Sequence, residues 1–103
     1  MDFLILYEKT IIGRVILNGE THQKIITRAN ELNYDLILRF KEFYGNSCEI
    51  APSEFERFNT QLLEVCRYYY EKQEVDVCHF RMEIEALTNL GKKENLPILV
   101  RPD

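Results

Sequence analysis

The chain has 103 residues, of which 46% are hydrophobic, and its 17 acidic and 13 basic residues give a net charge of −4. This length corresponds to one domain spanning residues 1–103, and the apolar fraction is sufficient for a core, so a disordered chain is excluded. The acidic balance argues against a protein that grips nucleic acid by its phosphates. The longest apolar run, residues 3–7, is too short to span a membrane. We therefore expect no signal peptide and no membrane partner.

The three cysteines, Cys48, Cys66 and Cys78, are too few and too widely spaced for a secreted scaffold held together by disulfides. We therefore predict a cytoplasmic protein with reduced thiols. Cys66 and Cys78 lie within apolar patterns, where a free cysteine usually packs as a small buried hydrophobic side chain.

The first segment, residues 2–18, is ambiguous. Residues 3–7 are apolar and rich in β-branched and aromatic side chains, which predicts a buried strand. Residues 11–16 follow helical spacing, with Thr10 as a possible N-cap and Asn18-Gly19 as a possible end. We favour a strand followed by a helix-like segment, and a β-hairpin is the alternative.

Residues 21–44 are predicted to form a long helix, beginning at Thr21 as N-cap and ending at Gly45. Apolar side chains recur at three- and four-residue steps through this segment, which places them on one helix face. The stretch Asn33-Tyr34-Asp35 is a possible break, after which Asp35 would cap a second piece.

Two further helices are predicted at residues 53–73 and 76–90. In the first, Ser53 and Glu56 match a capping box. In the second, Asp76 is the expected N-cap and Gly91 the expected end. The buried stripe of the first helix comprises Phe55, Phe58, Leu62, Val65 and Tyr69.

The tail, residues 96–102, is apolar and bracketed by prolines, which favours a short edge strand that pairs with residues 3–7. The predicted fold is therefore mainly α, a bundle of three to four amphipathic helices. A small β element from the N-terminal run and the C-terminal tail is possible, and an α+β fold is the alternative.

The sequence offers no motif for a metal, a cofactor or a nucleotide. Cys78 and His79 are adjacent, so on a helix their side chains diverge by about 100° and cannot share one ion. Cys66 with His79 is the only thiol–imidazole combination worth testing, and the apolar stripe around Cys66 favours an inert thiol. A hydrolytic enzyme using His22 or His79 with a nearby glutamate is a less favoured hypothesis, and we expect no enzyme activity.

Residues 42–85 hold ten acids and four bases, so this middle segment carries the whole negative excess. Such an uneven distribution of charge affects which partners a protein attracts, and it does not indicate a fold. Within this segment Tyr68 lies between Glu64 and Glu71 on one helix, and tyrosine is favoured at interfaces because it combines an apolar ring with a polar tip.

This compact acidic chain, with aromatic and carboxylate side chains on one helix, resembles small immunity proteins of bacterial toxin–immunity systems, including contact-dependent inhibition. The segment Lys9-Thr10-Ile11-Ile12-Gly13 is similar to the opening of such proteins. The resemblance implies a protein partner, a toxin domain that is often a basic nuclease, and transfers no functional residue.

The predicted function is therefore that of a non-catalytic inhibitor that covers a basic partner with an acidic face. The predicted contact residues are Glu56, Glu64, Tyr68, Glu71 and Glu83. The alternative is a small interaction or regulatory module, monomeric or homodimeric, that uses Tyr70 and the apolar tail Ile98-Leu99-Val100.

Overall fold

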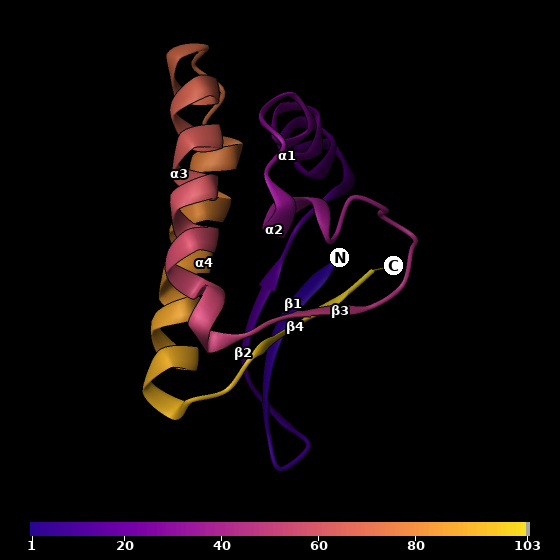
Figure 1. Cartoon of the computed structure of the whole chain (residues 1–103), viewed down its shortest axis with the longest axis vertical. Coiled ribbons are helices and arrows are strands. Elements are labelled where there is room, and N and C mark those ends of the chain that lie inside the picture. Colours follow the sequence, from indigo (N-terminus) through magenta and orange to yellow (C-terminus); the bar gives the residue numbers. More distant parts are fainter. Residues whose placement is uncertain (103) are drawn as a thin grey trace.

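The computed structural model describes residues 1–102 as an α+β domain in which helices predominate (Figure 1). Its strands are β1 (Asp2–Tyr7), β2 (Thr10–Ile16), β3 (Cys48–Ile50) and β4 (Ile98–Arg101). Its helices are α1 (Gly19–Leu32), α2 (Asp35–Leu38), the 3-10 turn η1 (Pro52–Glu54), α3 (Phe55–Glu71) and α4 (Asp76–Glu94). The alternative prediction, α+β, describes this architecture better than a helical bundle, because the helices pack on a sheet.

The strands form one antiparallel sheet in the order β2-β1-β4-β3. Residues 2–18 are therefore a β-hairpin, and the favoured helix-like interpretation of residues 10–18 was wrong. The hairpin turns at Glu8 and Lys9, which both have positive φ (48° and 69°). Two such residues match the twist of antiparallel strands, although glycine or asparagine usually occupies them.

The C-terminal tail pairs with β1, as predicted, with Val100 opposite Phe3. It is not an edge strand, however, because β3 pairs with its other side. The prolines do not disturb this central position, since Pro97 and Pro102 lie just outside β4 and no ladder hydrogen bond is lost.

The long helix predicted for residues 21–44 is two short helices, divided at the predicted break, although Tyr34 and not Asp35 is the N-cap of the second. Asn33 ends α1 in the left-handed conformation (φ 55°), which asparagine tolerates well. The chain leaves α2 after Leu38 and is not helical up to the predicted end. Thr21 is not the N-cap of α1; its backbone N–H donates to the side chain of Asn18, at 2.8 Å.

Helices α3 and α4 form an antiparallel hairpin on one side of the molecule (Figure 1). The capping box predicted between Ser53 and Glu56 is wrong, because Glu54 accepts a hydrogen bond from the Ala51 N–H instead, at 2.9 Å. Helix α4 begins at Asp76, so the predicted N-cap is wrong and Val75 takes that position; the helix continues past Gly91 to Glu94, with Asn95 as its C-cap. The predicted stripe of α3 is confirmed, since all five of its side chains are buried: Phe55, Phe58, Leu62, Val65 and Tyr69.

The core lies between the helices and one face of the sheet. Phe3 of β1 is fully buried, and its ring makes edge-on contacts with Phe40 at 5.1 Å and Phe80 of α4 at 5.2 Å. Within residues 1–102, no helix combines the length and the apolar composition required to span a bilayer.

Candidate protein-binding surface

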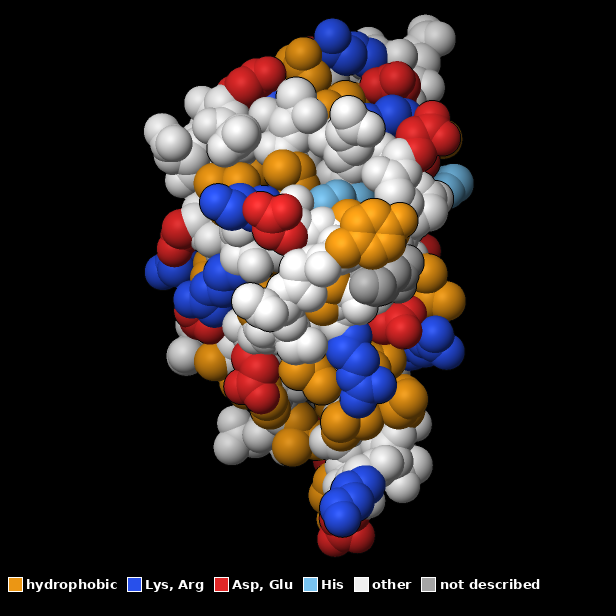
Figure 2. Space-filling view, turned by 90° about the vertical axis from the view of Figure 1, so that its right-hand side faces the viewer, with side chains coloured by type: hydrophobic (Ala, Val, Ile, Leu, Met, Phe, Trp, Pro, Cys, Tyr) orange, Lys and Arg blue, Asp and Glu red, His pale blue; other side chains and the backbone are white. Residues whose placement is uncertain are grey.

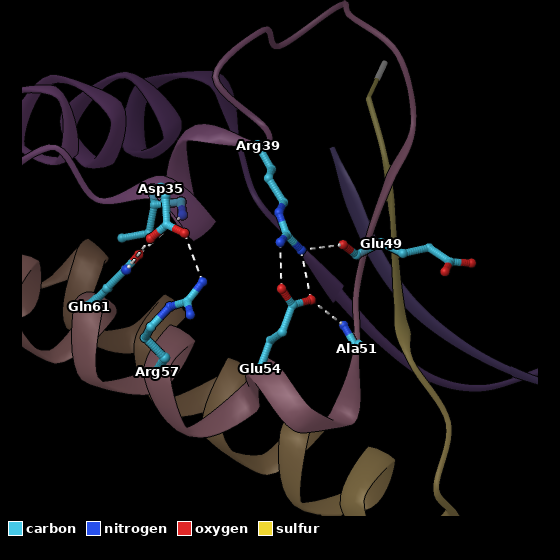
Figure 3. Close-up of polar contacts among 8 residues, drawn as sticks. Asp35, Arg39, Glu49, Ala51, Glu54, Arg57 and Gln61 are labelled. Carbon is cyan, nitrogen blue, oxygen red and sulfur yellow. Dashed lines mark hydrogen bonds and ion pairs between the residues drawn. The ribbon is translucent and has the colours of Figure 1, made fainter.

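The start of α3 is held by an ion pair between Arg39, just after α2, and Glu54 (Figure 3). The guanidinium donates from Nη1 to Glu54 Oε1 at 2.7 Å and from Nη2 to Oε2, and it also donates to the backbone oxygen of Glu49 at 3.1 Å. The hydrogen bonds from Arg39 and from the Ala51 N–H lower the pKa of Glu54 to about 2. This carboxylate therefore joins α2, β3 and α3.

A second contact ties α2 to the middle of α3 (Figure 3). Asp35 accepts hydrogen bonds from Gln61 Nε2 at 2.9 Å and from Arg57 Nη2 at 2.7 Å. The amide of Gln61 and the charge of Arg57 hold the pKa of Asp35 below its usual value, although desolvation opposes them. Buried Gln61 thus links the two helices.

A third contact ties α1 to the start of α4. Asp76 accepts a hydrogen bond from Thr21 Oγ1 at 2.7 Å and pairs with Lys24 at 3.2 Å, while Glu74 lies 3.6 Å from the same ammonium group. Burial alone would raise the pKa of Asp76, but these hydrogen bonds outweigh it and the pKa is lowered. Part of the acidic excess of residues 42–85 is therefore neutralised by Lys24 and Arg39 from outside that segment.

Three of the four predicted contact glutamates, Glu56, Glu71 and Glu83, are exposed and have no ion pair within residues 1–102. Glu64 is half-buried and pairs with Arg67 on its own helix, at 2.8 Å. The carboxylates of Glu56, Glu71 and Glu83 therefore remain available for a cationic partner.

The structure groups Glu56, Glu64 and Glu71 along one side of α3, hereafter the α3 face. They are eight and seven residues apart, which keeps them within roughly 80° of arc over about 22 Å of helix. Glu83 lies elsewhere, above a small pocket lined by residues of β2, α1 and α4 that include Thr21 and His79. The five predicted contacts therefore do not form one continuous site.

Tyr68 is not a free anchor. Its half-buried ring lies under the guanidinium of Arg28, 4.1 Å from the ring centroid, and the ammonium of Lys72, 4.7 Å away. Tyr69 adds an edge-on contact at 5.0 Å. The next ring, Tyr70, is 67% exposed and is the aromatic side chain that this end of α3 offers to a partner.

A polar groove of about 520 Å³ runs between α3 and α4 beside Glu56. Asn59 bridges its walls by donating to Thr88 Oγ1 at 2.9 Å, while the buried Asn59 Oδ1 has no hydrogen-bond partner among the described residues. Arg81 and Glu85 form an ion pair along one wall, at 2.8 Å. The sequence did not indicate this groove, because Asn59 and Thr88 are 29 residues apart and carry no motif.

The residues considered for catalysis are not assembled into one site. His22 is buried, with its Nε2 2.7 Å from the backbone oxygen of Phe40. His79 is exposed. The Sγ atom of Cys66 lies 2.6 Å from the Sγ atom of Cys78. The neighbour of the Cys66 thiol is therefore another thiol and not the imidazole of His79. Within residues 1–102, no three His, Cys, Asp or Glu side chains are placed to hold a metal ion.

The side of the molecule that is turned away from α3 and α4 carries scattered apolar groups between charged ones (Figure 2). On the edge strand β2, Ile11 is 48% and Ile16 is 61% exposed. The apolar tail proposed for self-association is mostly unavailable, because Ile98 and Val100 are buried in the sheet. Sequence reasoning missed the apolar edge because it placed these isoleucines in a helix-like segment and not in a strand.

Comparison with known proteins assigns no family. No family model matches this chain, and no curated protein or solved structure is significantly similar to it.

Proposed function

We propose that this chain is a non-catalytic binding protein that neutralises a basic protein partner, as immunity proteins of bacterial toxin–immunity systems do. The observation that carries the proposal is the α3 face, where Glu56 and Glu71 flank Glu64 and are exposed, with no ion pair among residues 1–102. A cationic toxin domain, such as a nuclease, has the complementary charge.

The proposed mechanism is occlusion. Carboxylates of the α3 face pair with Lys and Arg side chains that would otherwise contact substrate phosphates. The polar groove beside Glu56 accepts a partner side chain, and exposed Tyr70 adds apolar contact area. The ion pairs Arg39–Glu54 and Arg57–Asp35 connect the first half of α3 to α2 and the residues after it, so the backbone of the α3 face is already in place before a partner binds.

The test takes the product of the neighbouring gene as the candidate partner, with growth protection and binding kinetics as measurements; a neighbouring product without a basic toxin domain would count against the proposal. The double substitution Glu56→Lys with Glu71→Lys is expected to weaken binding about 10- to 100-fold, mainly through slower association, and to abolish protection. Raising the ionic strength is expected to weaken wild-type binding in the same way.

The matched control is Glu49→Lys with Glu94→Lys, which makes the same charge change at two exposed carboxylates away from the α3 face. This control is expected to bind nearly as the wild type does. Equal weakening in both variants would leave only a general charge effect and contradict the α3 face as the site. Full protection by the α3-face variant would contradict it as well.

The second candidate is a homodimeric interaction module, and exposed Ile11 and Ile16 on the edge strand β2 favour it. An unprotected edge strand with apolar side chains is a template for pairing with another chain. Light scattering over a concentration range tests this candidate. A dimer that Ile16→Lys dissociates would support it, and a monomer at all concentrations would reject it.

A further inference from the structure

Two thiols lie in contact where α3 and α4 meet. Cys66 is in the last two turns of α3 and Cys78 is in the first turn of α4, and their Sγ atoms are 2.6 Å apart. The Cys78 sulfur is also 3.6 Å from the backbone oxygen of Cys66. Cys66 is 9% exposed and Cys78 is more accessible, so a small solute reaches the contact from the Cys78 side.

We propose that Cys66 and Cys78 form a reversible oxidation site, at which hydrogen peroxide converts the two thiols into an intramolecular disulfide between α3 and α4. A disulfide requires its sulfurs about 2.05 Å apart and β-carbons that face each other. The two Sγ atoms lie 2.6 Å apart, closer than two unbonded sulfurs normally lie, so the two side chains are already directed at each other. Both belong to one helical hairpin, and therefore no second molecule is needed.

The chemistry proceeds in two balanced steps. The Cys78 thiolate attacks one peroxide oxygen and the O–O bond breaks, giving a sulfenic acid on Cys78 and releasing the other oxygen as water after protonation. The Cys66 sulfur then attacks Cys78 Sγ, the S–O bond breaks, and the Cys66 proton leaves with the hydroxyl group as a second water. The two thiols lose two electrons in total, and the peroxide gains them.

The environments of the two thiols support this order. Burial and the neighbouring Cys78 raise the pKa of Cys66 to about 11, so Cys66 stays protonated while the more accessible Cys78 meets the oxidant. A buried thiol held against the reacting sulfur is placed to resolve the sulfenic acid before further oxidation.

Cys48 provides an internal control. It lies in β3, makes no thiol contact within residues 1–102, and burial raises the pKa of its thiol. It therefore has no intramolecular partner, and we expect it to survive peroxide concentrations that oxidise the Cys66–Cys78 site.

The site has a structural consequence. The disulfide would close the loop that contains the α3–α4 connection, residues 72–75, and restrict the unfolded chain. Oxidation is therefore expected to raise the melting temperature by about 10 °C.

The experiment treats the reduced full-length chain with a small excess of hydrogen peroxide. We expect the number of free thiols to fall from the three of the sequence to one, the mass to drop by two hydrogen atoms, and a peptide map to join Cys66 to Cys78. A thiol reductant should reverse every change. The variant Cys48→Ser should cross-link as the wild type does, whereas Cys66→Ser should leave a Cys78 sulfenic acid that dimedone traps.

Retention of all three thiols by the folded wild type would overturn the proposal. So would disulfides that form only between molecules through Cys48. Both results come from the wild-type chain, so they decide the question even where the Cys66→Ser variant fails to fold, and neither depends on which partner the α3 face binds.

Discussion

At Glu54 a single carboxylate accepts hydrogen bonds from two parts of the chain, the side chain of Arg39 and the backbone of Ala51. Asp35 and Asp76 act in the same way toward Gln61 and Thr21. These three acids position the helices, while exposed acids such as Glu56 remain free for a partner. At the scale of single residues, some carboxylates thus hold the helices in place while others face solvent. The amino-acid composition does not distinguish these two roles.

The first prediction concerns the pH dependence of Glu54. Its pKa in the folded state, about 2, is below the unfolded value of 4.5, so its stabilising effect is present above pH 4.5 and is lost as the pH falls toward 2. Because the ion pair is partly solvent-screened, we expect Glu54→Gln to cost about 1 kcal/mol at pH 7. Urea unfolding at pH 7, 5 and 3 should show this difference shrinking as the pH falls.

Glu56→Gln is the control for this prediction, since Glu56 is exposed and has no ion pair among the described residues. Its unfolding free energy should follow that of the wild type at all three pH values. A Glu54→Gln deficit that stays constant from pH 7 to pH 3 would show that the lost interaction is not ionic.

At the scale of elements, the end of α4 is set by packing and not by its glycine. Gly91 is buried in the last turns of the helix, where an added Cβ would lie 2.8 Å from the ring of Phe55 and 2.9 Å from the backbone oxygen of Leu96. The helix therefore continues to Asn95, which adopts the left-handed conformation that closes it.

Gly91→Ala is accordingly expected to destabilise the protein by about 1–3 kcal/mol, because a backbone oxygen cannot move aside cheaply. This outcome is opposite to the helix propensity of alanine, which alone would stabilise the helix by about 1 kcal/mol. Chemical denaturation measures the difference. Gly19→Ala is the matched control: its added Cβ meets only Phe43 at an ordinary 3.8 Å, so the change should be small.

At the scale of the whole molecule, aromatic rings connect the layers. Phe3 contacts Phe80 of α4 on one side and Phe40 on the other, and Phe40 continues to Phe58 of α3 at 6.1 Å. This chain of rings joins the sheet, the segment after α2 and both long helices. The sheet and the α3–α4 hairpin therefore depend on a shared core.

Phe3→Ala should cost about 3–5 kcal/mol, a large part of the stability of a domain of this size. We expect a marked drop in the melting temperature, measured by circular dichroism. Tyr7→Ala on the same strand removes a ring that is 53% exposed and should change the stability by no more than about 0.5 kcal/mol. Equal effects of the two substitutions would contradict the central place of Phe3.

Sequence reasoning predicted the features that depend on local pattern. The three- and four-residue spacing from Phe55 to Tyr69 gave the buried stripe of α3, and the break near Asn33 gave the end of α1. It failed at the turn of Glu8 and Lys9, where neither residue has a side chain that favours positive φ. It also missed β3, because a strand of three residues is too short to show alternation.

The sequence by itself determined that this is a helix-rich single chain with an acidic middle segment, because periodicity and charge are properties of neighbouring residues. Only the tertiary structure decided which acids are neutralised, since Arg39 and Lys24 reach Glu54 and Asp76 from other elements. The same holds for the contact between Cys66 and Cys78, which the antiparallel packing of two helices creates. Proximity across the fold depends on how elements pack, and no local pattern encodes it.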